Sequence, residues 1–201
     1  MSPDPDGQRL DFGEQLFTVD GFLTAEACRE LIEWSEATGY EAATVNTLEG
    51  HRHLPDWRNN TRVMVDDTER ATALWERVRP LVPARILDWR AVGVNERLRF
   101  YRYDVGQQFD WHSDGAYERP NGERSFYTFM VYLNEGYEGG ATDFEADRPR
   151  GVPACTVAPH VGEALFFKHR IPHRGAPVLA GRKYVLRTDV MYAPADGGSD
   201  S

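Results

Sequence analysis

The second half of the chain consists of short runs of aromatic and β-branched residues, separated by turns rich in Gly, Asn and Pro. Such runs favour β-strands, and short strands in close succession are typical of an antiparallel barrel or a double-sheet jelly roll. We therefore expect the chain to form mainly β-strands from Asn95 onward. Its expected strands span residues 96–103, 125–133, 141–144, 156–157, 164–168 and 183–192.

Two amphipathic helices are expected ahead of these strands, which makes the predicted fold class α+β with helices backing one sheet. In the first, Thr24 is a suitable N-cap and Gly39 a suitable C-terminal stop. Its apolar residues follow helical spacing: Ala27, Cys28, Leu31, Ile32 and Trp34. The second begins near residues 66–68, ends at Pro80 and presents Ala71, Leu74, Trp75 and Val78 on one face.

The length of 201 residues suits one domain, which we place at residues 11–192, with a first strand within 12–19. Residues 1–10 and 193–201 are polar and rich in Pro, Gly, Ser and Asp, so a disordered lead and tail are expected. The net charge of -9 argues against nucleic-acid binding. No apolar run approaches the ~20 residues that span a bilayer, so no membrane contact is expected. Two distant cysteines and the lack of a signal-like start favour a reducing cytoplasm.

A polar stretch, Asp110 to Asp114, interrupts the aromatic region. On a β-strand, residues two apart project from one face, so His112 and Asp114 would point into one cavity. Such a pair is most of a two-histidine, one-carboxylate metal site, which leaves coordination positions open on ferrous iron. Asp110 would project from the same strand face as His112 and Asp114, so it is an alternative carboxylate ligand. A third ligand is available downstream at His169 or His173, and Pro172 argues against the helix that would place both on one face.

Two further groups of charged residues are candidate binding residues. Lys183 and Arg187 share one face of the expected strand 183–192, which is either solvated or turned inward to bind a carboxylate. Arg58 lies within a long polar segment, residues 46–60, of a kind that often forms a lid or binding loop, and Arg62 follows this segment. These two arginines either meet an anionic part of a substrate or are solvated. The role of the segment itself cannot be deduced from the sequence.

The ordered set of motifs resembles the Fe(II)- and 2-oxoglutarate-dependent dioxygenases, and is most similar to their prolyl 4-hydroxylase-like branch. The motifs are Tyr103-x5-Phe109-x2-His112-x-Asp114, Val-Tyr-Leu-Asn at 131–134, Gly-Gly-Ala-Thr-Asp-Phe at 139–144, Gly-Glu-Ala-Leu-Phe-Phe at 162–167, His173-x-Gly175 and Gly181-x-Lys183. The resemblance covers residues 20–192. It implies a double-stranded β-helix (jelly roll) core and iron held by His112, Asp114 and His173.

The same resemblance assigns binding roles around the iron. Lys183 matches the lysine that pairs with the far carboxylate of 2-oxoglutarate, and Tyr103 matches the tyrosine that hydrogen-bonds this co-substrate. Thr128 and Tyr132 share a strand face and are further pocket candidates. Arg187 is expected to reach either the inner carboxylate of 2-oxoglutarate or the substrate. Arg174 stands where many relatives carry an acidic residue, so we expect it at the pocket rim, near the substrate.

The implied reaction uses Fe(II), 2-oxoglutarate and O2, with ascorbate as a supporting reductant, and releases succinate and CO2. Asp114 favours hydroxylation, since related halogenases carry a small residue there; desaturation stays open. The expected substrate is an amino acid, a peptide or a small biosynthetic intermediate. The alternatives are a cupin-like metal dioxygenase that does not use 2-oxoglutarate and a non-catalytic jelly-roll metal-binding protein. The sequence leaves the substrate and the oligomeric state undetermined.

Overall fold

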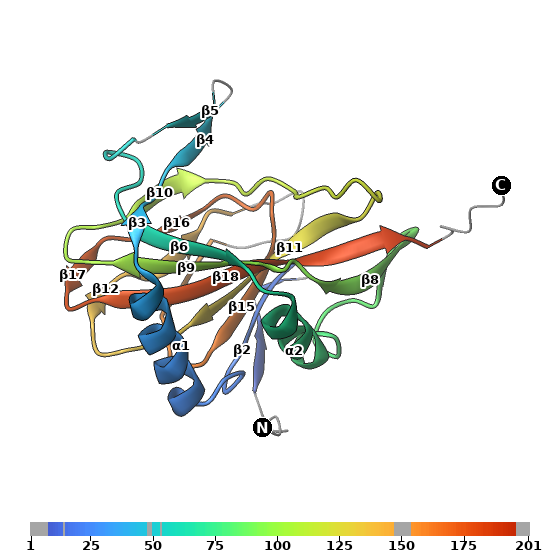
Figure 1. Ribbon diagram of the computed structural model, residues 1–201, viewed down its shortest axis with the longest axis horizontal. Helices are drawn as coiled ribbons and strands as arrows, with labels where there is room; N and C mark the ends of the chain where they lie inside the picture. The colour runs from blue at the N-terminus through green and yellow to red at the C-terminus, as the bar shows by residue number, and fades with distance from the viewer. Residues whose placement is uncertain (1–7, 14, 48–49, 53, 147–153, 196–201) are drawn as a thin grey trace.

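The computed structural model describes residues 8–13, 15–47, 50–52, 54–146 and 154–195, which form two layers of antiparallel sheet with helices on one outer face (Figure 1). Within these residues, no helix is long and apolar enough to cross a membrane. The main sheet has ten strands. Eight of them lie side by side in the order β1 (Arg9–Asp11), β2 (Leu16–Val19), β15 (Ala164–Lys168), β11 (Arg124–Tyr132), β18 (Lys183–Pro194), β9 (Arg97–Tyr103), β6 (Thr61–Asp66) and β3 (Glu41–Ala42). The other two form a branch, in which β8 (Trp89–Val94) pairs with β18 and with β7 (Arg85–Ile86).

A four-stranded sheet faces the main sheet, in the order β10 (Phe109–His112), β16 (His173–Gly175), β13 (Thr142–Phe144) and β14 (Cys155–Val157). Two short ribbons complete the strands: β12 (Glu138–Gly139) with β17 (Val178–Ala180), and β4 (Val45–Thr47) with β5 (Gly50–Arg52). Buried side chains from both larger sheets, such as Tyr101, Phe109, Phe144 and Phe167, pack together between them. This two-layer arrangement confirms the predicted α+β jelly roll.

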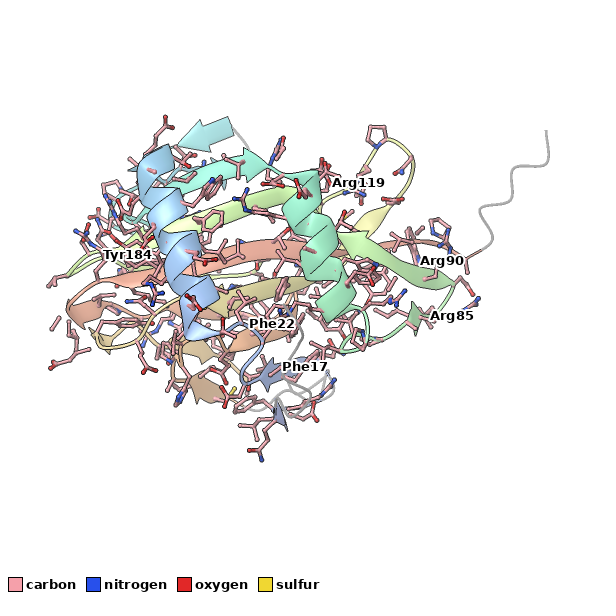
Figure 2. The ribbon with its side chains drawn as sticks, turned by 60° about the horizontal axis from the view of Figure 1, so that its bottom comes forward. Phe17, Phe22, Arg85, Arg90, Arg119 and Tyr184 are labelled. Atoms are coloured by element: carbon pink, nitrogen blue, oxygen red, sulfur yellow. The ribbon has the colours of Figure 1, made fainter. Side chains whose placement is uncertain are left out.

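The other face of the main sheet is covered by α1 (Ala25–Thr38) and α2 (Thr68–Val78), which Figure 2 shows lying across it. The predicted caps are confirmed, because the Thr24 hydroxyl accepts a hydrogen bond from the Ala27 N–H and Gly39 ends α1 with a φ of 94°. The Asp67 carboxylate caps α2 through the Arg70 N–H. A second core of aromatic and aliphatic side chains, including Phe100, Phe129 and Phe166, lies beneath the helices.

The sheet extends beyond the predicted domain at both ends. Residues 9–11 form β1 against β2, so the expected disordered lead is wrong for residues 9 and 10, and the first expected strand is limited to Leu16–Val19. At the other end, Ala193 and Pro194 continue β18 against β8. In both places the polar composition hid a strand that is held by backbone pairing. Residues 1–7 and 196–201 lie outside the described residues.

Register across the main sheet determines which side chains face the smaller sheet. Lys183 pairs with Tyr103, Val185 with Tyr101, and Arg187 with Arg99 across β18 and β9. Arg62 on β6 pairs with Tyr101, while Met130 on β11 pairs with Arg187. Paired residues share a face of the sheet, so these side chains form rows on the inner face. The charged face of β18 is therefore turned inward, not solvated.

Gly162 lies where the jelly roll contacts the segment before α1, so substituting it tests this contact. Its φ is +79°, and a Cβ added there would lie 2.0 Å from the Leu23 carbonyl oxygen. Gly122 has a similar φ of +84° with open space around it. Gly122→Ala is expected to lower the free energy of unfolding by about 1–2 kcal/mol through backbone strain alone. Gly162→Ala has the same backbone strain and also a steric clash with Leu23. It is expected to lower the free energy of unfolding by a further ~1–3 kcal/mol, and urea denaturation measures both effects. Equal effects of the two substitutions would contradict this contact.

Candidate active site

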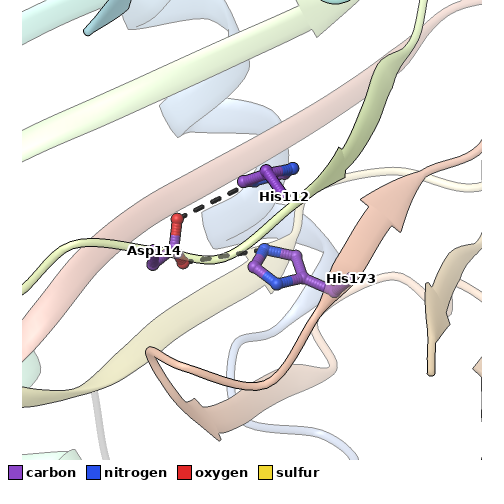
Figure 3. Close-up of side chains that lie close together, drawn as sticks. All are labelled: His112, Asp114 and His173. Atoms are coloured by element: carbon purple, nitrogen blue, oxygen red, sulfur yellow. Dashed lines mark ion pairs between the residues drawn. The ribbon is translucent and has the colours of Figure 1, made fainter. Parts of the chain in front are cut away.

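Three potential metal ligands, His112, Asp114 and His173, meet between the two sheets (Figure 3). The histidines lie on neighbouring strands, since His112 ends β10 in register with His173, the first residue of β16. Asp114 Oδ1 is 3.8 Å from His112 Nε2, and Asp114 Oδ2 is 3.6 Å from His173 Nε2. One ligand atom from each residue lies within 4.8 Å of the others. The three donors therefore surround one point, as a facial metal site requires.

The route by which Asp114 reaches this point differs from the expectation of a shared strand face. β10 ends at His112, and Asp114 lies in the irregular segment that follows. Its backbone N–H donates a 2.7 Å hydrogen bond to the carbonyl oxygen of His169. The carboxylate is thus positioned by the loop between β15 and β16, not by strand pleating.

Hydrogen bonds and burial hold the two histidines in the form that a metal ligand needs. His112 Nδ1 lies 2.7 Å from the Asp110 carbonyl oxygen, and His173 Nδ1 lies 2.9 Å from that of Ile171. Each Nδ1 therefore carries the proton and leaves the Nε2 lone pair facing Asp114. Burial lowers the pKa of both imidazoles, that of His112 to about 3, so both are neutral near pH 7.

Asp114 is kept ionised although it is almost fully enclosed. Burial alone would raise the pKa of Asp114, but the guanidinium of Arg187, 2.9 Å away, holds it well below its usual range. The Thr128 hydroxyl donates a 2.6 Å hydrogen bond to the other carboxylate oxygen. Two neutral imidazoles and one carboxylate are the donor set expected for ferrous iron, so the residues present fit that metal.

Thr128 also explains why His169 is not part of the cluster. Because its hydroxyl proton goes to Asp114, Thr128 Oγ1 accepts from His169 Nδ1 at 3.0 Å. His169 Nε2 then accepts from the Ser125 hydroxyl at 2.8 Å. Both ring nitrogens are occupied, and His169 supports Asp114 through Thr128. The expectation that Thr128 lines the co-substrate pocket is therefore replaced by a role in orienting the carboxylate.

Asp110, the rival carboxylate, lies outside the cluster. Its side chain accepts a 2.8 Å hydrogen bond from the Trp111 N–H, and only its backbone carbonyl contacts His112. Because Asp110 and Asp114 are both two residues from His112, strand alternation alone could not show which of them is the ligand.

A narrow cavity opens from the cluster toward Lys183. It is lined by Tyr101, Tyr103, Phe109, His112, Met130, Thr142, His173, Gly175, Lys183, Val185 and Arg187. Lys183 is 2% exposed, and its ammonium donates to the Gly140 carbonyl oxygen at 2.6 Å without a carboxylate partner among the described residues. Burial lowers the pKa of Lys183 to about 7. A buried ammonium facing a cavity fits a ligand carboxylate.

The remaining pocket candidates separate into two groups. Tyr103 lines this cavity, whereas Tyr132 stands behind it with its hydroxyl 2.7 Å from the Thr142 hydroxyl. Met130 and Thr142 line the cavity and were not predicted. Met130 could have been found, because it has the same strand parity as Thr128 and Tyr132.

A second cavity of about 400 Å³ is also lined by His112, and by Asp114. Four arginines line it: Arg58, Arg62, Arg99 and Arg187. Arg58 and Arg62 thus lie where substrate residues were expected. Arg174 does not line it, because it points to the opposite face of β16 from His173 and pairs with Asp143 at 2.8 Å. The expectation that Arg174 borders the pocket is therefore wrong.

Comparison with known proteins agrees with this geometry. Residues 98–188 match the family model described as the 2OG-Fe(II) oxygenase superfamily. This match covers a little less than half of the chain and contains His112, Asp114, His173 and Lys183. Probable prolyl 4-hydroxylase 3 of Arabidopsis thaliana is 23% identical over 202 residues, which cover 87% of this chain and 68% of that protein. Further curated relatives are covered over 63% and 64% of their length, so the chain spans about two thirds of the proteins it matches.

Solved structures of the same kind share the fold. A prolyl-4-hydroxylase from Pseudomonas putida is 19% identical with a TM-score of 0.64, over 88% of this chain and 92% of that one. A Trichoplax adhaerens prolyl hydroxylase in complex with a hypoxia inducible factor peptide fragment is 16% identical with a TM-score of 0.65, over 88% of this chain and 83% of that one. The superfamily implies Fe(II), 2-oxoglutarate and O2 as cofactor, co-substrate and oxidant.

Removing Asp114 tests the proposed metal ligands. Asp114→Ala is expected to weaken Fe(II) binding by roughly 100-fold or more, because the only carboxylate of the cluster is lost. Asp110→Ala is the matched control and should leave the affinity unchanged. Anaerobic calorimetric titration measures both, with circular dichroism to show that each variant is folded. Wild-type affinity in Asp114→Ala would rule out this ligand set.

The pKa of Lys183 gives 2-oxoglutarate binding a defined pH dependence. Pairing with a carboxylate raises this pKa above its value of about 7 in the free protein. The affinity for 2-oxoglutarate is therefore highest below pH 7, where the Lys183 ammonium is already charged. It falls as pH rises, because binding then requires Lys183 to take up a proton. The dissociation constant should rise by about tenfold per pH unit above about pH 7.

Calorimetry with Fe(II)-loaded protein under anaerobic conditions measures this dependence. Lys183→Arg keeps its charge throughout and should bind with a nearly constant affinity. A wild-type dissociation constant that is equally constant would contradict the role of Lys183.

Proposed function

We propose that this chain is a Fe(II)- and 2-oxoglutarate-dependent dioxygenase that hydroxylates an unactivated C–H bond and releases succinate and CO2. One observation carries the proposal: the His112, Asp114 and His173 cluster opens into a cavity that ends at the buried, carboxylate-free ammonium of Lys183. This arrangement supports a metal site and a co-substrate site that adjoin each other. The superfamily match supports the same activity.

When bound, iron and 2-oxoglutarate supply the oxidising chemistry, and the protein supplies position and exclusion of water. His112, Asp114 and His173 would hold the iron. Lys183 would take the far carboxylate of 2-oxoglutarate, and Tyr103 beside it would hydrogen-bond the co-substrate. Arg187 lines both cavities, so its contact with either 2-oxoglutarate or the substrate stays a prediction.

Hydroxylation is the outcome that Asp114 favours. Its carboxylate fills the coordination position that related halogenases leave to a halide, according to the resemblance drawn from the sequence. Thr128 and Arg187 further fix this carboxylate in place. The proposed substrate is an amino acid, a peptide or a small biosynthetic intermediate. A peptide is supported by the Trichoplax adhaerens relative, which was solved with one. The free cysteines, Cys28 and Cys155, agree with a cytoplasmic location.

Lys183→Ala separates this function from a dioxygenase that does not use 2-oxoglutarate. Loss of the buried charge pair should raise the KM for 2-oxoglutarate by about 100-fold, with Fe(II) still bound. Lys168→Ala, which removes a lysine outside the co-substrate cavity, should leave this KM unchanged. The assay follows succinate release with ferrous iron and ascorbate. An unaltered dependence on 2-oxoglutarate in Lys183→Ala would favour the cupin-like alternative, and no succinate from the wild type would favour a non-catalytic protein.

A further inference from the structure

Two arginines in the 400 Å³ cavity, the buried Arg58 and the half-buried Arg62, form no ion pair with any described residue. Arg58 is 5% exposed, and its Nη2 is buried without a hydrogen-bond acceptor. Within the described residues, the Arg62 guanidinium donates hydrogen bonds only to Thr44, to its carbonyl oxygen at 3.4 Å and its hydroxyl at 2.8 Å. Glu41 pairs with Arg62 in strand register, but it is exposed and forms no ion pair with it. Burying the Arg58 charge without a counter-charge is unfavourable, so this arrangement favours a bound anion.

The two guanidinium groups converge on one point. Arg58 Nη1 and Arg62 Nη1 approach the same Thr44 carbonyl oxygen, at 3.5 Å and 3.4 Å. Like charges held together disfavour each other, and burial together with the charge of Arg58 lowers the pKa of Arg62. An anion bound between them would offset this repulsion.

Arg58 is held rigidly for such a contact. Its guanidinium carbon lies 4.3 Å from the ring centre of Phe109 and 4.8 Å from that of Tyr101. Its Nε donates to Asn60 Oδ1 at 2.8 Å, which fixes the plane of the group. A planar, preorganised guanidinium matches the geometry of a carboxylate.

The other charges of the cavity are already balanced. Arg99 pairs with Asp189 at 3.2 Å, and Arg187 pairs with Asp114 at 2.9 Å. The four arginines and two aspartates that line the cavity leave two positive charges, which belong to Arg58 and Arg62. The cavity therefore selects an anion even though the whole chain has a net charge of -9.

We assign 2-oxoglutarate to the other cavity, which contains Lys183. Neither Arg58 nor Arg62 lines the cavity that contains Lys183. The arginine-lined cavity also includes His112 and Asp114, so a molecule bound there extends from the two guanidiniums to the metal ligands. Its volume of about 400 Å³ lies in the range for small-molecule sites, ~300–1,000 Å³.

We propose that Arg58 and Arg62 bind a carboxylate of the substrate, so that the molecule oxidised is a carboxylic acid with its reacting carbon directed toward His112 and Asp114. This inference rests on the proposed function and names the substrate class for it. A peptide with only uncharged amides in the cavity would leave both guanidiniums unpaired. The carboxylate belongs either to a free small acid or to the C-terminus of a peptide, and the experiment below distinguishes these sources.

Bromide is a direct probe of the anion site. Crystals of the protein with Fe(II) and an inert 2-oxoglutarate analogue, which fills the co-substrate cavity, are soaked in sodium bromide. An anomalous difference peak is expected between the guanidiniums of Arg58 and Arg62, and it should be absent in Arg62→Gln. Arg90→Gln removes an exposed arginine on β8 and should keep the peak (Figure 2). No peak at this position in the wild type would overturn the proposal.

Turnover then identifies the source of the carboxylate. Succinate release is measured with amino and organic acids, each paired with its carboxamide, and with proline peptides that have free or amidated C-termini. Acids should be preferred over their amides by about 100-fold or more in kcat/KM, because the amide leaves the guanidiniums of Arg58 and Arg62 without a counter-charge. In Arg62→Gln the KM for an accepted acid should rise by roughly 30-fold and the preference for acids should decrease. Arg90→Gln should keep both.

If only free small acids stimulate succinate release, the substrate is a small molecule. If peptides with a free C-terminus stimulate it and amidated peptides do not, the carboxylate is the C-terminus of a peptide. Equal turnover of acids and amides, or of amidated peptides, would overturn the proposal. Bromide binding requires no catalysis. Failure of the proposed function, seen as no succinate from any compound, is therefore distinguishable from failure of the anion site.

Discussion

The buried carboxylate of Asp114 is the group on which the rest of the site depends. A charge enclosed between two sheets is stable only when other groups compensate it, and here Arg187 and the Thr128 hydroxyl do so. Thr128 is in turn fixed by His169 and Ser125, while the Asp114 N–H is anchored on the His169 carbonyl oxygen. Both layers therefore meet at this carboxylate: β11 and β18 of the main sheet supply its partners, and β10 and β16 supply the two histidines beside it.

β18 explains how one strand serves two cavities. Its inward residues alternate with apolar residues that pack under the helices, such as Leu186. Lys183 at one end closes the co-substrate cavity, Arg187 borders both cavities, and Asp189 faces the arginine-lined one. Spacing of two residues along a strand advances ~7 Å, so the order of these charges sets the order of the subsites. The proposed co-substrate, metal and substrate positions thus follow one another along a single strand.

Much of the fold was predictable because its signals are local. The caps at Thr24 and Gly39, the helical stripe through Leu31 and the aromatic runs of the second half all specify elements without long-range information. The sequence failed where pairing across the sheet decides the structure, as at β1, β8 and the end of β18. At the site, residue spacing brought His112 and Asp114 together but for a different reason, since a loop contact positions Asp114. Arg174 was misplaced because its pairing with Asp143 on the outer face depends on β13, which lies far away in sequence.

The contrast between global and local charge explains how an acidic protein can select anions. A net charge of -9 acts through solvent, where screening limits its range to about 8–10 Å. Arg58, Arg62 and Lys183 act inside cavities of lower dielectric, where each charge is felt more strongly. Lys183 and the arginine pair line different cavities, so the proposed co-substrate and substrate carboxylates would each meet their own positive charge. The acidic exterior discourages nonspecific binding of polyanions, while a small acid that enters either cavity meets an uncompensated positive charge.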